Sequence, residues 1–201
     1  MRKNTLKIVL IGIGVCMCVG LYFGYQYLWK AADQHFKRAE YQQVFKLIKY
    51  VPKPQNVERL RIYSQTFMAL GEYDKARKGY EKLFDKTKDP AYRLIVGNIL
   101  NQQEDYVGAI KVYEEVISLN PNYVQVYVNL STIYRIKGNN DKAVEIAERG
   151  IGSNGNSIIL YELLVSLMQE KKDSPRYNEA VNKLKLLDPQ NILLKQIGEV
   201  K

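Results

Sequence analysis

Apolar residues recur along most of the chain at spacings that fit α-helices. Between positions 124 and 137 they fall mainly three and four residues apart, which places them on one helical face: Val124, Val126, Tyr127, Leu130, Ile133, Tyr134 and Ile136. The chain has no strand pattern of note. The pattern therefore predicts an all-α protein.

A short phrase returns about every 33 residues through the middle of the chain. Its clearest copies end at Ala76, Ala109 and Ala143, which are 33 and 34 residues apart, and a later copy ends at Ala180. A fixed period in this range is typical of helical solenoids, whose units bury their apolar faces by stacking on their neighbours. Proteins of this class act by presenting surfaces.

Asp or Asn followed by Pro also keeps this period. The pairs are Asp89-Pro90, Asn120-Pro121 and Asp188-Pro189, and Asn154-Gly155 stands where another copy would fall. A side-chain acceptor followed by a residue without an N–H group suits the first turn of a helix. We therefore expect helices to start at the three proline pairs, and a turn at Asn154-Gly155.

These residues resemble the tetratricopeptide repeat family, whose units are antiparallel helix pairs of about 34 residues. Units 90–123 and 124–157 match best. Unit 57–90 has Ser64 where the family favours glycine, and unit 158–191 has Lys171 to Pro175 in place of the glycine turn. The resemblance implies a right-handed solenoid of about four to five helix pairs, with a degenerate first repeat in 29–56 and repeats at 57–90, 90–123, 124–157 and 158–191. The amphipathic tail 192–201 is expected to form a capping helix.

The amino-terminal region follows a different pattern. The stretch 8–28 has no charged side chain, the preceding tail 1–7 is basic, and aromatic residues cluster at 22–29. About 21 residues at about 1.5 Å each span the ~30 Å hydrocarbon layer, and aromatic residues are enriched at its edge. We predict a transmembrane helix over 8–28, with a cleaved signal peptide as the alternative. Because no proline or glycine separates Tyr25 from Val51, this helix is expected to continue into the first repeat.

One face of the predicted transmembrane helix is lined with small residues four positions apart, namely Gly12, Cys16, Gly20 and Gly24. Such a stripe permits close packing against another helix in lipid, including a second copy of this chain.

Most of the positive charge flanks the predicted span. The net charge of +9 divides into +3 before residue 30, +4 over 30–56 and +2 over 57–201. We assign the basic residues after the span to anionic lipid headgroups: Lys30, Lys37, Arg38, Lys46 and Lys49. Nucleic acid is not an expected partner, because the repeats lack a dedicated basic face. The amino terminus is expected in the cytoplasm and the repeats on the other side of the membrane, in a periplasm-like space.

The resemblance also implies a binding groove, built in this family mostly from the first helix of each pair. Carried onto this chain, its polar residues are Arg61, Gln65, Asn98, Asn101, Asn129, Thr132, Arg135 and Ser166. The family's clamp for a terminal carboxylate is not matched, because Ile95 and Gln125 occupy two of its positions. Neutral amides and hydroxyls can instead bond the backbone of an extended peptide without reading its sequence.

Catalysis has little support in this sequence. The only histidine is His35, and both cysteines lie inside the predicted span. No cluster has metal-ligand spacing, and no glycine-rich loop follows a strand, so we predict neither an enzyme nor a cofactor or metal.

The sequence predicts a membrane-anchored adaptor or scaffold for other proteins, as a subunit of a larger membrane or cell-envelope assembly. The alternative is a chaperone-like factor that binds client polypeptides near a translocation channel. A lipid- or nucleic-acid-binding protein that uses Lys46, Lys49 and Lys53 is a third hypothesis.

Overall fold

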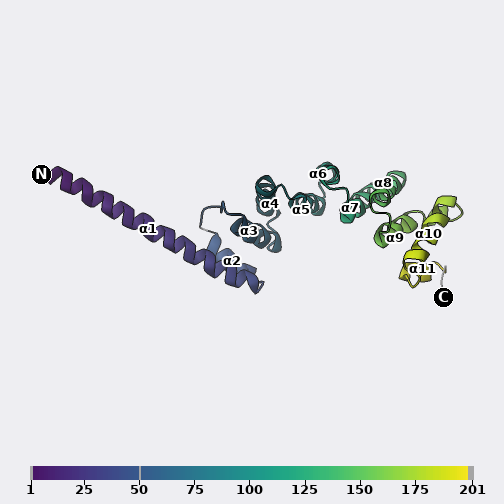
Figure 1. Ribbon diagram of the computed structural model, residues 1–201, viewed down its shortest axis with the longest axis horizontal. Helices are drawn as coiled ribbons and strands as arrows, with labels where there is room; N and C mark the ends of the chain where they lie inside the picture. Colours follow the sequence, from purple (N-terminus) through teal and green to yellow (C-terminus); the bar gives the residue numbers. More distant parts are fainter. Residues whose placement is uncertain (1, 50, 199–201) are drawn as a thin grey trace. The chain divides into compact units, whose positions relative to one another are not determined.

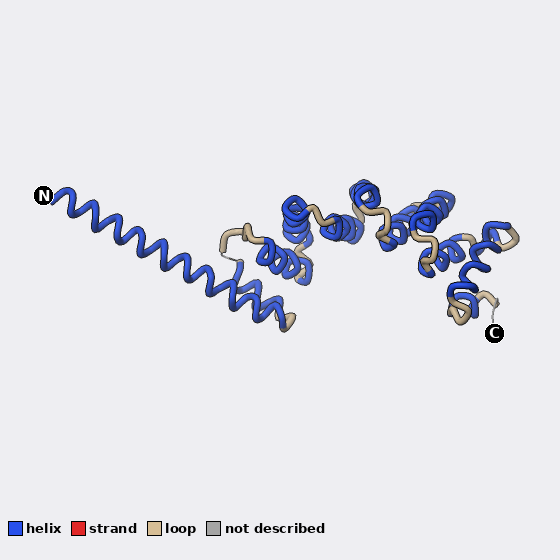
Figure 2. Tube along the Cα trace, in the orientation of Figure 1, coloured by secondary structure: helices blue, strands red, loops and turns tan. Residues whose placement is uncertain are grey.

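The described part of the chain is almost entirely helical. The computed structural model describes residues 2–49 and 51–198, and for residues 2–16 it describes the backbone alone. Its helices are α1 (Arg2–Lys37), α2 (Tyr41–Ile48), α3 (Val57–Ala69), α4 (Tyr73–Thr87), α5 (Pro90–Gln102), α6 (Tyr106–Leu119), α7 (Val124–Ile136), α8 (Asn140–Ser153), α9 (Ile158–Leu167), the 3-10 helix η1 (Gln169–Lys171), α10 (Pro175–Leu187) and α11 (Ile192–Gln196) (Figure 1). No strand occurs among these residues (Figure 2), which confirms the predicted all-α class.

The chain divides into two compact units, Met1–Lys88 and Asp89–Lys201. In the first unit α1 packs against α2, and α3 packs against α4. In the second unit the pairs are α5 with α6, α7 with α8, and α9 with α10. Since short turns join the two helices of each pair, the helices run antiparallel.

Four of these pairs share one turn geometry. The turns contain one residue with a positive φ each, namely Ala39 (56°), Gly71 (74°), Glu104 (61°) and Gly138 (74°). In each turn the next residue donates its N–H to a carbonyl five residues earlier, at 2.9 or 3.0 Å. This is the Schellman arrangement, which satisfies the last carbonyls of a helix. The turn between α1 and α2 therefore has the geometry of the others, although its sequence keeps little of the repeated phrase.

A small residue stands where the two helices of a pair approach most closely. A Cβ atom added at Gly97 of α5 would lie 2.6 Å from Cε1 of Tyr113 on α6. In the α3–α4 pair the small residue is on the second helix, because a Cβ atom at Gly79 would lie 2.1 Å from Oγ of Ser64. Either helix can thus supply the space that close packing needs.

Of the three Asp/Asn-Pro pairs, only the first starts a helix. Asp89 is the N-cap of α5 and accepts a hydrogen bond from the Ala91 N–H at 2.9 Å. Asn120 instead ends α6, and Asp188 ends α10. Their side chains accept hydrogen bonds from backbone N–H groups two residues later, at 3.0 and 3.2 Å. The prediction was wrong at these two pairs because Asn and Asp side chains stabilise turns as well as helix starts.

The connection between α9 and α10 is longer than the other turns within pairs. It runs from Met168 to Ser174 and contains η1, and Ser174 then caps α10 by accepting from the Tyr177 N–H at 3.2 Å. This agrees with the short insertion that the spacing of Ala143 and Ala180 indicates. After α10, the fully buried Leu194 of α11 packs into the apolar cluster formed by α9 and α10. Residues 199–201 of the predicted capping helix lie outside the described residues.

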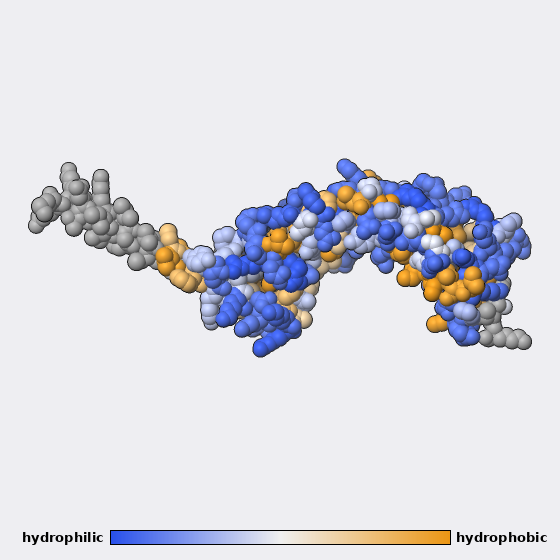
Figure 3. Space-filling view, in the orientation of Figure 1, coloured by the Kyte–Doolittle hydropathy of each residue, from blue (hydrophilic) through white to orange (hydrophobic). Residues whose placement is uncertain are grey.

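The last part of α1 packs against α2 and α3, whereas its middle part is exposed. Trp29 and Ala32 are buried, and the guanidinium carbon of Arg59 on α3 lies 5.2 Å from the Tyr25 ring centroid and 5.8 Å from that of Trp29. Before this contact, large apolar side chains face solvent: Met17, Val19, Leu21, Tyr22 and Phe23. Figure 3 shows an exposed hydrophobic patch next to the grey part of the chain. α1 is a single helix from Arg2 to Lys37, so no turn separates its exposed part from the part that packs against α2.

Within the described residues, no helix combines the length and the apolar character that crossing a membrane requires. Part of the predicted span, 8–16, belongs to the stretch whose side chains are not described. The transmembrane helix over 8–28 therefore stays a prediction.

Candidate functional site

The polar residues assigned to the groove lie on the first helix of each pair. Arg61 and Gln65 belong to α3 in the first unit. In the second unit, α5 contributes Asn98 and Asn101, α7 contributes Asn129, Thr132 and Arg135, and α9 contributes Ser166. Arg135 and Ser166 are exposed, and the other six are half-buried.

Hydrogen bonds bring two of these residues together with two others, and we call Asn98, Tyr113, Gln125 and Asn129 the amide cluster. The Tyr113 hydroxyl donates to Oδ1 of Asn98 at 2.8 Å. Nδ2 of Asn129 donates to the same Asn98 oxygen at 2.8 Å and to the Tyr113 hydroxyl at 3.3 Å. Nε2 of Gln125 donates to Oδ1 of Asn129 at 2.8 Å. The cluster thus joins helices α5, α6 and α7.

The amide cluster runs from the surface into the core. Gln125 is exposed, Asn98 and Asn129 are half-buried, and Tyr113 is fully buried. Burial raises the pKa of the Tyr113 hydroxyl to about 12, and the hydrogen bond from Asn129 opposes this rise only in part. Tyr113 therefore stays neutral at physiological pH and can both donate and accept.

After these hydrogen bonds, one side-chain donor and one side-chain acceptor of the cluster have no partner within the described part of the chain. The Asn98 oxygen already accepts two bonds, but its Nδ2 donates to no other residue in the described part of the chain. Oε1 of Gln125 likewise accepts no hydrogen bond within that part. An amide nitrogen carries two donors and an amide oxygen accepts. The cluster can therefore offer a donor and an acceptor, on oriented side chains, to a bound molecule.

Other predicted groove residues are engaged in local contacts. The Arg61 guanidinium donates to Gln65 at 3.0 Å and to Glu58 at 2.5 Å, and it lies 5.5 Å from the Phe36 ring centroid. The hydroxyl of Thr132 donates to the backbone carbonyl of Val128 at 2.8 Å. The neutral ladder predicted from the sequence is therefore interrupted by bonds within single helices. Asn98 and Asn129 are the pair that the structure brings together.

The residues assigned to lipid lie on the surface of the first unit. Lys30, Lys37, Arg38, Lys46 and Lys49 are exposed, and Lys37 pairs with Asp33 at 2.6 Å. In the small-residue stripe, Gly20 and Gly24 are exposed, and a Cβ atom added at either would meet nothing within 4 Å. Gly12 and Cys16 belong to the stretch 2–16, of which only the backbone is described.

Tyr113 is not among the residues predicted for the groove, and its polar role follows only from the structure. The ring does pack in the core, but its hydroxyl emerges beside Asn98 because Gly97 leaves room for the ring against α5. The juxtaposition of Gly97 and Asn98, opposite a tyrosine on the second helix, was the available signal. Gln125 was noted only as a mismatch to the carboxylate clamp, and the structure places it at the exposed end of the cluster.

Comparison with known families finds two matches in the second unit. The family described as "TPR repeat" matches residues 97–131, and that described as "Tetratricopeptide repeat" matches residues 124–157. Together these matches indicate tetratricopeptide repeats in residues 97–157. These matches include all four members of the amide cluster, and neither indicates a catalytic activity.

A curated relative also carries this repeat. The chain is 31% identical over 88 residues to the TPR repeat-containing protein YpiA of Bacillus subtilis (strain 168). The alignment covers 44% of this chain but only 21% of YpiA, so the chain matches about a fifth of that protein's length.

Solved structures share the helical architecture over more of the chain. A crystal structure of MamA protein matches with a TM-score of 0.63 and 22% identity, over 88% of this chain and 93% of MamA. A MamA structure from Desulfovibrio magneticus RS-1 matches with a TM-score of 0.54 and 18% identity, over 74% of this chain and 89% of that one. At these identities the similarity shows a common helical fold.

Proposed function

We propose that this protein is a membrane-anchored scaffold whose amide cluster holds an extended segment of a partner protein. Tetratricopeptide folds suit protein–protein interaction, because stacked helix pairs present a continuous surface. The observation that carries the proposal is the network of Asn98, Tyr113, Gln125 and Asn129, which fixes two side-chain amides and leaves part of their hydrogen-bonding capacity open.

The amide cluster would bind backbone rather than particular side chains. Nδ2 of Asn98 would donate to a peptide carbonyl, and Oε1 of Gln125 would accept from a peptide N–H. Because Asn98 is already fixed by Tyr113 and Asn129, little side-chain entropy would be lost on binding. Recognition of this kind gives affinity from main-chain hydrogen bonds.

The proposed anchor is the apolar stretch 8–28. Its support is the absence of charge in the sequence, together with exposed apolar side chains on α1, among them Leu21 at 75% and Phe23 at 66% exposure. Aqueous exposure of such a surface is unfavourable, whereas lipid would cover it. The basic residues that follow, including Lys30, would meet the headgroups. We place the repeats on the non-cytoplasmic side of the membrane, as part of a membrane or envelope assembly, with Gly20 and Gly24 open to another helix.

A site-specific photocrosslinker tests the scaffold. A photoreactive amino acid replaces Asn101, which lies one turn after Asn98 on α5 and outside the amide cluster, and the matched control places it at Lys111, which is exposed on α6. After illumination of cells that express the full chain, position 101 should yield one or a few discrete adducts in the membrane fraction, and position 111 none of them. Absence of adducts at position 101, or recovery of the protein from the soluble fraction alone, would overturn the proposal.

The same experiment separates the second candidate function. Backbone recognition tolerates many sequences, so the amide cluster would also suit a chaperone-like factor for unfolded clients. A broad smear of adducts that unrelated unfolded peptides suppress would favour client binding. One or a few adducts that resist such competition would favour the scaffold.

A further inference from the structure

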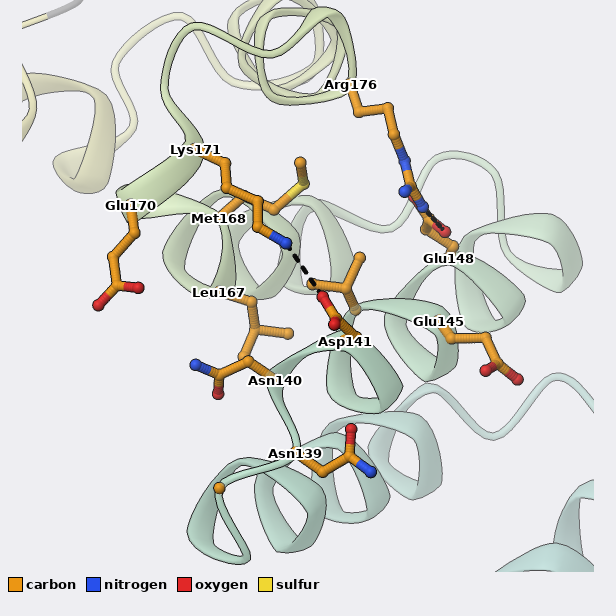
Figure 4. Close-up of a pocket in the computed structure, with 12 residues that line it drawn as sticks. Asn139, Asn140, Asp141, Glu145, Glu148, Leu167, Met168, Glu170, Lys171 and Arg176 are labelled. Carbon is orange, nitrogen blue, oxygen red and sulfur yellow. Dashed lines mark hydrogen bonds and ion pairs between the residues drawn. The ribbon is translucent and has the colours of Figure 1, made fainter.

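A second candidate surface lies between α8, η1 and α10. It is a cavity of about 740 Å³ (Figure 4). One wall is the start of α8, and the other is formed by η1 and the start of α10. The long connection between α9 and α10 contributes to this second wall, so the cavity arises where the chain departs from the repeat pattern.

The floor and rim of the cavity differ in chemistry. Apolar side chains of Val144, Leu167 and Met168 line it, and Met168 is buried. Around them stand four carboxylates and two basic groups: Asp141, Glu145, Glu148, Glu170, Lys171 and Arg176. A surface with an apolar floor and an excess of carboxylates complements a side chain with an aliphatic stem and a positive head.

Lys171 of this chain is a side chain of that kind, and its positive head already pairs with a carboxylate of the cavity. Figure 4 shows its side chain reaching from η1 to Asp141 on α8, where Nζ lies 3.0 Å from Oδ1. The two side chains are 65% and 89% exposed, and water weakens an ion pair that is so open to solvent. Lys171 therefore shows which group the site accepts, and a partner could displace it at little cost.

The carboxylates of the rim differ in whether they are already paired with a basic side chain. Arg176 forms an ion pair with Glu148, through Nε at 2.9 Å among other contacts, and Glu145 pairs with Lys142 at 2.5 Å. The side-chain carboxylate of Glu170 forms no ion pair or hydrogen bond with the rest of the described chain. A carboxylate without a partner thus stands on the same rim as the weakly held Asp141.

We propose that this cavity binds a basic segment of a partner protein, with a lysine or arginine of the partner replacing Lys171 at Asp141. The partner's aliphatic stem lies on Val144, Leu167 and Met168, and a neighbouring basic residue meets Glu170. This surface is formed around the second helices α8 and α10, and it is independent of the amide cluster on α5, α6 and α7.

Peptide binding to the full-length chain in a neutral detergent tests this site. The probe is a short, labelled, amidated peptide of lysine, leucine and glycine, and its counterpart has glutamate in place of lysine. Fluorescence anisotropy should show saturable binding of the lysine peptide, weakening as salt rises, and no binding of the glutamate peptide. Amide shifts in the NMR spectrum should map to α8, η1 and α10, and leave Asn98 unchanged.

Two substitutions should move the affinity in opposite directions. Asp141→Asn should weaken binding of the lysine peptide about fivefold or more, because it removes the carboxylate that receives the charge. Lys171→Gln should tighten binding about threefold, because it removes the competing internal lysine. The matched control, Asp173→Asn, changes the same charge on an exposed residue of the α9–α10 connection outside the cavity.

A purely structural ion pair would not give a gain on loss of Lys171. Unchanged or weaker binding by Lys171→Gln, equal binding of the two peptides, or shifts confined to the amide cluster would each overturn the assignment. Urea unfolding of every variant checks that the exposed substitutions leave the fold intact.

Discussion

The α3–α4 and α5–α6 pairs solve the same packing problem in opposite ways. In α3–α4 the first helix carries the larger residue, Ser64, and Gly79 on the second helix makes room for it. In α5–α6 the first helix carries Gly97, and the Tyr113 ring fills the space from the second helix. The position of the glycine, on the first or the second helix, therefore determines which side chain fills the space between the two helices.

This choice has a consequence for the surface. In α3–α4 the Ser64 hydroxyl turns back to the carbonyl of Leu60 at 2.7 Å and serves only its own helix. In α5–α6 the tyrosine hydroxyl crosses the gap and organises Asn98 and Asn129. Gly97 on the first helix thus allows a core tyrosine to reach the polar side chains of α5 and α7.

The largest effect should come from filling the gap in α5–α6. Gly97→Ala places a methyl group 2.6 and 2.8 Å from two ring carbons of Tyr113, which is fully buried and cannot move aside. We expect a loss of about 2–3 kcal/mol in the free energy of unfolding, measured with urea, even though alanine favours helices.

Gly152→Ala is the matched control, since a Cβ atom at this helical position meets nothing within 4 Å. It should stabilise the protein by up to about 1 kcal/mol. Equal effects of the two substitutions would show that the contact with Tyr113 is not tight.

Moving the glycine of α3–α4 to the other helix should recover stability. Gly79→Ala alone brings a methyl group 2.1 Å from the Ser64 hydroxyl oxygen and should be destabilising. The double variant Ser64→Gly with Gly79→Ala gives this pair the glycine arrangement of α5–α6. A double-mutant cycle should yield a favourable coupling of about 1.5 kcal/mol. Additive effects would contradict the view that the two positions share one space.

Removal of the Tyr113 hydroxyl should uncouple the core from the surface. Tyr113→Phe deletes one donor and one acceptor of the amide cluster and should cost about 1 kcal/mol of unfolding free energy. It should also weaken binding of a backbone-recognised peptide, because Asn98 loses a group that holds it.

The same substitution should alter the response to high pH. Burial raises the pKa of Tyr113 to about 12 in the folded chain, so between its ordinary value and pH 12 the unfolded chain releases this proton first. Stability should therefore fall as pH rises through this window, by up to about 1.4 kcal/mol per unit. The fall should be shallower in Tyr113→Phe than in Tyr134→Phe, a control at a half-buried tyrosine on α7. Identical slopes would count against the assignment.

The smallest effect concerns the turns. Glu104 adopts a positive φ of 61° where the equivalent residues of two other pairs are Gly71 and Gly138. Glu104→Gly should stabilise the protein by about 0.5–1 kcal/mol, and Gly138→Ala should destabilise it by a similar amount. Thermal unfolding followed by circular dichroism would detect both. A loss of stability in Glu104→Gly would mean that contacts of the glutamate side chain stabilise the fold by more than the strain of its positive φ destabilises it.

The sequence predicted the helices well because their apolar spacing and repeated turns are local signals. It failed at Asn120-Pro121 and Asp188-Pro189, where the same residue types form a turn after a helix. It named Asn98 and Asn129 but not their connection, because the path through Tyr113 depends on a contact between helices that no local pattern encodes. For the cavity beside η1, the sequence signal was only the longer distance between the repeated residues Ala143 and Ala180, which indicates an insertion but not its shape.

Side-chain amide NMR signals test most directly whether the amide cluster binds the backbone of a partner. The full-length, ¹⁵N-labelled chain is titrated with the segment recovered by crosslinking and with the same segment methylated at its backbone nitrogens. We predict that the unmodified peptide shifts the side-chain amide signals of Asn98 and Gln125, and that the methylated peptide binds at least about tenfold more weakly because it cannot donate to Gln125. Equal binding of the two peptides, or binding that leaves both signals unmoved, would contradict the account.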